Sequence, residues 1–254
     1  MYNNAIKSII ITALVLFLSG CAARPAILPD ETPPMHTVAE FSDDENVSYT
    51  RDPWEGLNRN VYTFNYEADR FVLLPVVGAY EAVVPSFART GISNFYANLR
   101  EIRTFYNCVL QAKSKRSLVT LGRFVTNSTI GIGGLFDPAT SFGMRRENED
   151  FDHTLETWGV GTGPYLVLPI LGPNTARSAG GFAVDGGVRW AIANAIDPFG
   201  STGARTEIET GTTALETVDL RHRESFRYYD SDYPFEYYMV RYLFSQEREL
   251  KILR

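Results

Sequence analysis

The chain has 254 residues, with 24 Lys and Arg against 30 Asp and Glu, and a formal charge of −6 at pH 7. Its 44% hydrophobic and 21% charged residues are ordinary for a globular protein and exclude collagen, coiled coil and wholesale disorder. The acidic balance argues against a general nucleic-acid-binding protein. Two cysteines exclude a disulfide scaffold and a multi-cysteine zinc site.

The first 20 residues predict a cleaved signal peptide. Lys7 precedes a short apolar stretch at residues 9–18, which is too short to remain as a transmembrane helix. The run Leu18-Ser19-Gly20-Cys21 resembles a bacterial lipobox, which implies cleavage before Cys21 and acylation of that residue. The following Ala22, where an Asp would suggest retention at the inner membrane, favours the outer membrane. The alternative is a plain signal peptide followed by an incidental cysteine.

Residues 21–50 predict a lipidated acidic tether. The segment after Cys21 holds six acids, one arginine and four prolines, and it shows no apolar periodicity. We expect disorder here, because such a segment buries too little apolar surface to fold. The expected organisation is therefore a signal peptide at 1–20, a tether at 21–50 and one helical domain at 51–254.

The first predicted helix of the domain follows Asp52-Pro53, which indicates an N-cap and a proline at the first helical position. Apolar residues spaced four and three apart then mark one helix face, and Pro75 is expected to end the helix. These face residues are Leu57, Val61, Phe64, Ala68 and Phe71.

Further helices are predicted along the rest of the chain. One opens after Pro85, with Ala88, Ile92, Phe95 and Leu99 on one face, and helical spacing continues to Leu110. The next spans 114–126, with Leu118, Leu121 and Val125 on one face. Lys113, Lys115 and Arg116 cluster at its start. Bases there oppose the helix dipole, so the cluster indicates an acidic or phosphate partner, or else a solvated surface.

Residues 129–173 are rich in Gly and Pro. Within them, residues 165–171 predict either a buried strand or a membrane-contacting loop. Helical patterns return at about 174–196, 204–219 and 234–250. The predicted fold class is therefore mainly α, with Gly/Pro-rich connecting segments.

A search for chemistry finds no catalytic motif and no metal site. The four acids Glu147, Glu149, Asp150 and Asp152 lack the glycine and terminal glutamate of a calcium loop, so a solvated loop is favoured. Cys108 lies among apolar residues and is interpreted as a buried structural thiol.

Ten short motifs, in order from 52 to about 200, resemble the MlaA (VacJ) family of lipoproteins. They are Asp52-Pro53-Trp54-Glu55-Gly56-Leu57-Asn58-Arg59, Val61-Tyr62-Thr63-Phe64-Asn65, Val84-Pro85, Arg89-Thr90-Gly91-Ile92-Ser93-Asn94-Phe95, Asn98-Leu99, Gly122-Arg123-Phe124, Asn127-Ser128-Thr129, Gly131-Ile132-Gly133-Gly134-Leu135-Phe136-Asp137, Trp158-Gly159-Val160-Gly161-Thr162-Gly163-Pro164-Tyr165 and Leu168-Pro169.

The resemblance implies an α-helical ring in the inner leaflet of the outer membrane of a Gram-negative bacterium, anchored on the periplasmic side. Its central channel would pass phospholipids that have strayed into the outer leaflet to a soluble periplasmic carrier. A trimeric porin is the implied membrane partner. The chain would be no enzyme, would bind no nucleic acid and would need no cofactor beyond the covalent lipid on Cys21.

Two other functions stay open at this point. One is a lipoprotein that braces a porin and moves no lipid. The other is a lipid hydrolase, which would need Ser128 or Cys108 as nucleophile and His153 as base.

The expected site residues fall into two groups. Asp52, Pro53 and Trp54 should hold the first helix of the ring, with Asn58 and Asn65 in the same structural motif. Possible phospholipid contacts or channel-mouth positions, weighed against simple loop geometry, are Arg145, Arg146, Gly159, Gly161, Gly163 and Pro164. The two arginines suit a lipid phosphate because they form charge-assisted hydrogen bonds.

Overall fold

The structure is a computed structural model that describes residues 51–196, 205–229 and 236–252. The predicted signal peptide, Cys21 and the tether lie outside the described residues. The elements are α2 (Glu55–Ala68), a π-helical turn η3 (Asp69–Leu73), α3 (Leu74–Val83), α4 (Ser86–Leu110), α5 (Ser114–Thr129), α6 (Pro138–Ser141), α7 (Phe151–Thr157), β1 (Tyr165–Leu168), β2 (Gly172–Thr175), α8 (Ala176–Ile196), α9 (Arg205–Arg223) and α10 (Glu236–Ile252). The mainly α prediction is confirmed.

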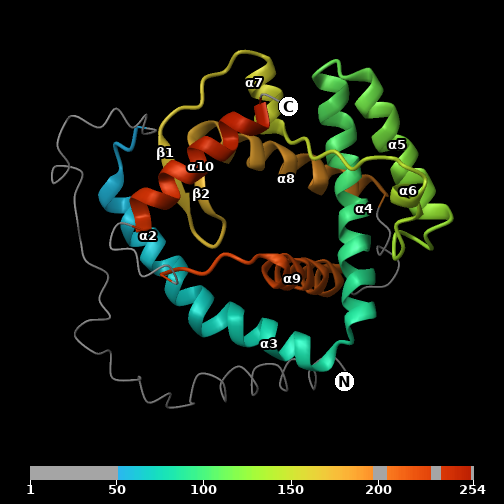
Figure 1. Cartoon of the computed structure of the whole chain (residues 1–254), viewed down its shortest axis with the longest axis horizontal. Helices are drawn as coiled ribbons and strands as arrows, with labels where there is room; N and C mark the ends of the chain where they lie inside the picture. Colours follow the sequence, from blue (N-terminus) through green and yellow to red (C-terminus); the bar gives the residue numbers. More distant parts are fainter. Residues whose placement is uncertain (1–50, 197–204, 230–235, 253–254) are drawn as a thin grey trace.

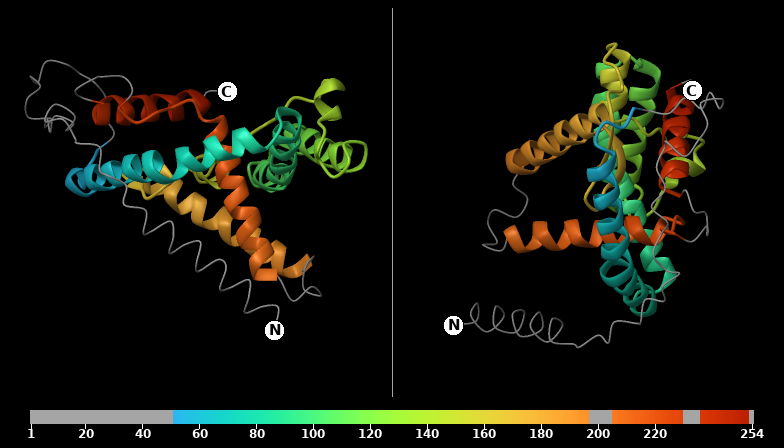
Figure 2. Two further views of the ribbon diagram at one scale, coloured as in Figure 1. Left: turned by 90° about the horizontal axis from the view of Figure 1, so that it is seen from below. Right: turned by 90° about the vertical axis from the view of Figure 1, so that its left-hand side faces the viewer.

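The helices are arranged in a ring-like outline (Figure 1). In this view α2 and α3 form its left and lower sides, α4 its right side, and α8 and α10 its upper side, with α9 seen end-on within it. Helices α8 and α9 leave this plane in the same direction (Figure 2). No helix within the described residues has the length and apolarity needed to cross a membrane.

The prediction that Pro75 ends the first helix is wrong. Helix α2 continues through the π turn η3 into α3, and Pro75 lies in the first turn of α3. Proline cannot donate a backbone hydrogen bond, and the wider π turn directly before it absorbs that loss. The continuous rod ends at Val83, because the residue before Pro85 favours an extended backbone.

The predicted apolar faces exist, but they are exposed instead of packed in a core. On α2, the exposed fractions are 58% for Leu57 and 53% for Phe64, and Phe71 of η3 is also 53% exposed. On α5, Leu118 is 69% exposed and Val125 is 50% exposed. The buried residues of α2 and α5 are polar or tyrosine, which reverses the usual pattern of a water-soluble helix.

A buried polar network takes the place of a hydrophobic core under α4 and α5. The Arg123 guanidinium is fully buried and bonds Glu101 at 2.8 Å and both carboxylate oxygens of Asp137 at 3.1 Å. Burial alone would raise the pKa of Asp137, but hydrogen bonds from Thr140 and Asn127 and the charge of Arg123 lower it to about 2. These bonds satisfy polar groups that would otherwise be costly to bury.

An aromatic cluster forms the apolar core on the opposite side of the ring. Its buried members come from α2, β1 and α10 and are Tyr62, Tyr165, Val167, Tyr237, Tyr238 and Val240. The antiparallel strands β1 and β2 pair Tyr165 with Thr175 and Leu168 with Gly172. Of the segment 165–171, residues Tyr165 and Val167 are buried strand, while Ile170 and Leu171 are exposed at the hairpin tip.

Candidate functional site

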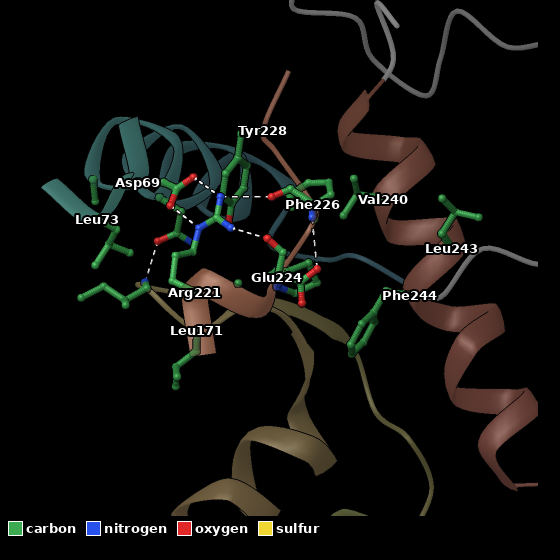
Figure 3. A pocket seen from close by; sticks show the side chains of 15 residues that line it. Asp69, Leu73, Leu171, Arg221, Glu224, Phe226, Tyr228, Val240, Leu243 and Phe244 are labelled. Atoms are coloured by element: carbon green, nitrogen blue, oxygen red, sulfur yellow. Dashed lines mark hydrogen bonds and ion pairs between the residues drawn. The ribbon is translucent and has the colours of Figure 1, made fainter. Parts of the chain in front are cut away.

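A cavity of about 670 Å³ lies between four separate parts of the described chain. Figure 3 shows its lining, which comes from α2 and η3, the β1–β2 hairpin tip, the C-terminal end of α9, and α10. The lining side chains are mostly apolar and include Leu73, Leu171, Phe226, Leu243 and Phe244. A cavity of this size and lining suits an apolar ligand.

One ion pair stands in the wall of this cavity. The Arg221 guanidinium donates to both carboxylate oxygens of Asp69, at 2.5 and 2.7 Å, and to the carbonyls of Glu224 and Phe226 at 2.9 and 3.0 Å (Figure 3). The hydrogen bonds to Asp69 raise the pKa of Arg221, although burial acts against it. Because its donors are used within the protein, Arg221 fixes the wall and leaves the cavity apolar in character.

Two asparagines of α2 hold the hairpin at the cavity. Asn58 donates to the carbonyl of Tyr165 at 3.2 Å and accepts from the N–H of Val167 at 2.9 Å. Seven residues later, Asn65 donates to the carbonyl of Leu168 at 2.9 Å and accepts from the N–H of Ile170 at 2.7 Å. The two side chains pair with β1 as a neighbouring strand would, and this pairing places the hairpin tip at the cavity.

Helix α10 is fixed to α2 through tyrosine hydroxyls. Tyr62 donates to Glu236 at 2.7 Å, Tyr237 to Asp52 at 2.5 Å, and Tyr238 to Glu55 at 2.8 Å. Burial, together with these bonds, raises the pKa of all three tyrosines, so they remain donors across the physiological pH range. Another lining residue, Tyr228, has its pKa raised to about 12, mainly by burial. The wall formed by α10 is thus positioned by the acids at the start of α2.

The expected capping role of Asp52 and Pro53 is wrong. The N-cap residue of α2 is Trp54, without a side-chain cap, and Pro53 lies in the turn before the helix. The Asp52 carboxylate instead accepts from Asn58 at 2.7 Å and from Arg241 at 3.2 Å. Long-range partners outweigh the local capping bond because Asp52 is nearly buried, with 1% of its side chain exposed. Trp54 is 47% exposed and is not part of the buried core.

The other expected site residues lie apart from this cavity. Arg145 and Arg146 line a second cavity of about 470 Å³ beside α6. Gly159, Gly161, Gly163 and Pro164 form the connection from α7 to β1 and line neither cavity. Gly159 and Gly163 have φ angles of +84° and +72°, which explains the glycines by backbone conformation. Their role at a channel mouth stays a prediction.

The cationic cluster at the start of α5 and the acids near 150 are partners. Lys113 and Arg116 both bond Glu149 at 2.9 Å, so the acidic partner is correct for these two residues and the favoured solvated surface holds only for Lys115. The solvated loop expected for the four acids is therefore wrong. Asp152 is also buried, paired with Arg177 at 2.7 Å, and Asp150 caps α7. The described residues hold no His, Cys, Asp or Glu group suited to a metal ion.

Cys108 is a buried structural thiol, as predicted. It is 0% exposed, and burial raises its pKa to about 11, which opposes thiolate formation. Ser128 accepts a hydrogen bond from Asn98 at 2.9 Å, while His153 lies by Glu149 and Asp150 at 3.5 and 3.3 Å. These contacts show no nucleophile–base pair between Ser128 and His153.

The family model described as "MlaA lipoprotein" matches residues 50–251. The chain belongs to the MlaA lipoprotein family. Similar proteins include the "Intermembrane phospholipid transport system lipoprotein MlaA" of Escherichia coli K12, 40% identical over 139 residues, 53% of this chain and 55% of that protein. The protein of the same name from Haemophilus influenzae is 35% identical over 150 residues, 58% of this chain and 60% of that protein. The alignments span only about half the length of these curated relatives.

The MlaA fold is also found among solved structures. One, described as "Structural basis for maintenance of bacterial outer membrane lipid asymmetry", has a TM-score of 0.61 and 33% sequence identity. The likeness covers 79% of this chain and 98% of the other.

The cavity residues of η3, α9 and α10 in this MlaA protein could not be predicted from the sequence. Asp69 and Arg221 are separated by 152 positions. Neither belongs to a recognisable motif.

Proposed function

We propose that this MlaA protein is an outer-membrane lipoprotein that removes mislocalised phospholipids from the outer leaflet. It passes them through the ring to a soluble periplasmic carrier and so maintains lipid asymmetry. The family membership and the names of the relatives support this proposal. Association with a trimeric porin is part of the same proposal, as is anchoring by a lipid on Cys21.

The single observation that carries the proposal is the reversed polarity of the helices. Large apolar side chains are exposed along α2, η3, α3, α4 and α5, at Leu57, Phe71, Val83, Phe87, Val109 and Leu118 among others. Water-soluble monomers rarely expose large contiguous apolar patches. Helices also satisfy their own backbone groups, so they tolerate membrane depth. A ring lying in one leaflet accounts for exposed apolar faces on described helices of which none could span a membrane.

The cavity beside α10 also supports the proposal. Its lining is mostly apolar, and its one arginine is paired with Asp69, so it suits acyl chains better than a phosphate. A lipid could therefore rest its chains there while its headgroup stays in water. The Gly/Pro connection before β1 would shape the mouth of this path.

Filling the cavity tests the proposal. Ala68 lines the cavity from α2, so Ala68→Phe should reduce transfer of fluorescent phospholipid from outer-membrane vesicles to a soluble acceptor by about tenfold. Ala79→Phe, an exposed alanine of α3 that does not line the cavity, is the matched control and should transfer normally. Equal transfer by both folded variants would remove the cavity from the lipid path.

The hydrolase alternative has less support, because the Cys108 thiol is fully buried and Ser128 and His153 have separate partners. Lipid recovered from the same transfer assay should be chemically unchanged, as the transport proposal requires.

A further inference from the structure

The second cavity carries chemistry that the transport path does not use. It has a volume of about 470 Å³ and lies between α6 and the irregular segment after it. Its lining residues are Asp137, Thr140, Gly143, Met144, Arg145 and Arg146. None of these lines the larger cavity by α10.

One arginine at this cavity takes no part in the ion pairs formed there. Arg146, with 40% of its side chain exposed, bonds Asp137 at 2.9 Å and approaches Glu101 at 3.7 Å. The buried Arg123 bonds the same two carboxylates. Two acids are thus matched by two bases. Arg145 is exposed and forms no hydrogen bond or ion pair with any described residue, so its charge is uncompensated.

Exposed apolar residues, here called the apolar rim, adjoin the cavity-lining residues in sequence. Phe142 precedes the cavity-lining Gly143 and is 63% exposed, and Phe136 precedes Asp137 and is 61% exposed. The tight turn before them directs Ile130 and Ile132 outward, each 64% exposed. Aromatic side chains beside arginines are typical of the boundary between acyl chains and headgroups.

We propose that Arg145 and Arg146, with the cavity beside α6, bind the headgroup of an anionic phospholipid of the surrounding leaflet. The lipid is a resident neighbour of the ring and differs from the lipid carried through the larger cavity. The uncompensated arginine attracts the phosphate, the partly exposed Arg146 adds a second donor, and Phe136 and Phe142 enter the acyl region. This inference rests on the membrane placement in the proposed function.

The test uses the full chain and vesicles of phosphatidylcholine with or without phosphatidylglycerol. Wild-type protein should bind the anionic vesicles more tightly, and Arg145→Gln should weaken that binding about fivefold, about 1 kcal/mol. Arg145 is chosen over Arg146 because its loss breaks no internal ion pair. Lys115→Gln, which removes an exposed base from the start of α5, is the matched control and should bind as wild type. Added inorganic phosphate should not release the protein, since the apolar rim requires a lipid.

Three results would overturn the headgroup site. Equal weakening by Lys115→Gln and Arg145→Gln would show a general charge effect, and an unchanged Arg145→Gln would show that the arginine meets no lipid. Release by inorganic phosphate would assign the site to a free anion. The proposed function is tested separately, because binding to neutral vesicles and lipid transfer depend on the apolar faces and on the cavity by α10.

Discussion

Replacing Asn65 by leucine should detach the hairpin tip from α2. Leucine matches asparagine in shape but offers neither of the bonds to Leu168 and Ile170. Asn65 is 3% exposed, so the carbonyl and the N–H that it serves would lose their partners in a buried setting. At about 1–3 kcal/mol for each unsatisfied group, partly offset by water at the exposed tip, the free energy of unfolding should fall by about 2–4 kcal/mol.

Two measurements check this expectation in detergent. Chemical denaturation gives the free energy of unfolding, and hydrogen exchange reports the amide of Ile170, which should lose its protection. Asn60→Leu is the matched control, because Asn60 lies exposed on the same helix and should change neither quantity. An Asn65→Leu protein with native stability and a protected Ile170 amide would refute the pairing of α2 with β1.

Other expectations concern separate parts of the chain. Trp54→Ala should lower the free energy of unfolding by less than about 1 kcal/mol, since Trp54 is 47% exposed; a larger loss by denaturation would contradict its exposure. Gly134→Ala should cost about 2 kcal/mol or more in thermal unfolding, because φ is +92° and a Cβ would lie 2.7 Å from a neighbouring side chain. Gly133→Ala, at φ +68° with open space, should cost less, and equal costs would count against steric exclusion. The depressed pKa of Asp137, about 2, adds stability that is present above its ordinary pKa of 3.8 and is lost as pH falls toward 2. Asp137→Asn should therefore flatten the acid limb of a stability-against-pH curve, and an unchanged limb would assign the acid sensitivity elsewhere. Cys21→Ser should abolish acyl labelling and processing of the signal peptide; normal labelling would disprove the anchor.

Local patterns in the sequence predicted the helices well and their packing badly. The spacing of Leu57, Phe64 and Phe71 marks a true helix face, yet periodicity cannot say whether an apolar face meets a core or a membrane. The same limit applies to Leu118 on α5. The prediction that the helix ends at Pro75 failed for a different reason. The π turn that accommodates the proline has no sequence signal of its own.

The site depends on pairings between distant segments. Asp52 has the form of a helix cap, and only α10, nearly 190 residues later, shows that it serves Tyr237 and Arg241 instead. The family motif includes Asn58 and Asn65, and the structure shows that their side chains hydrogen-bond the backbone of β1 and the hairpin tip. Arg221 and the α10 residues of the cavity wall belong to no sequence motif. Their position beside Asp69 is therefore seen only in the folded chain.

We propose that this protein removes phospholipid from the outer leaflet of the outer membrane. The most direct measurement is surface-accessible phosphatidylethanolamine, labelled on whole cells by an amine reagent that does not cross the membrane. Cells lacking the protein should label more strongly, wild-type protein should restore the low level, and Ala68→Phe at equal abundance should not. Unchanged labelling in cells that lack the protein would contradict the account.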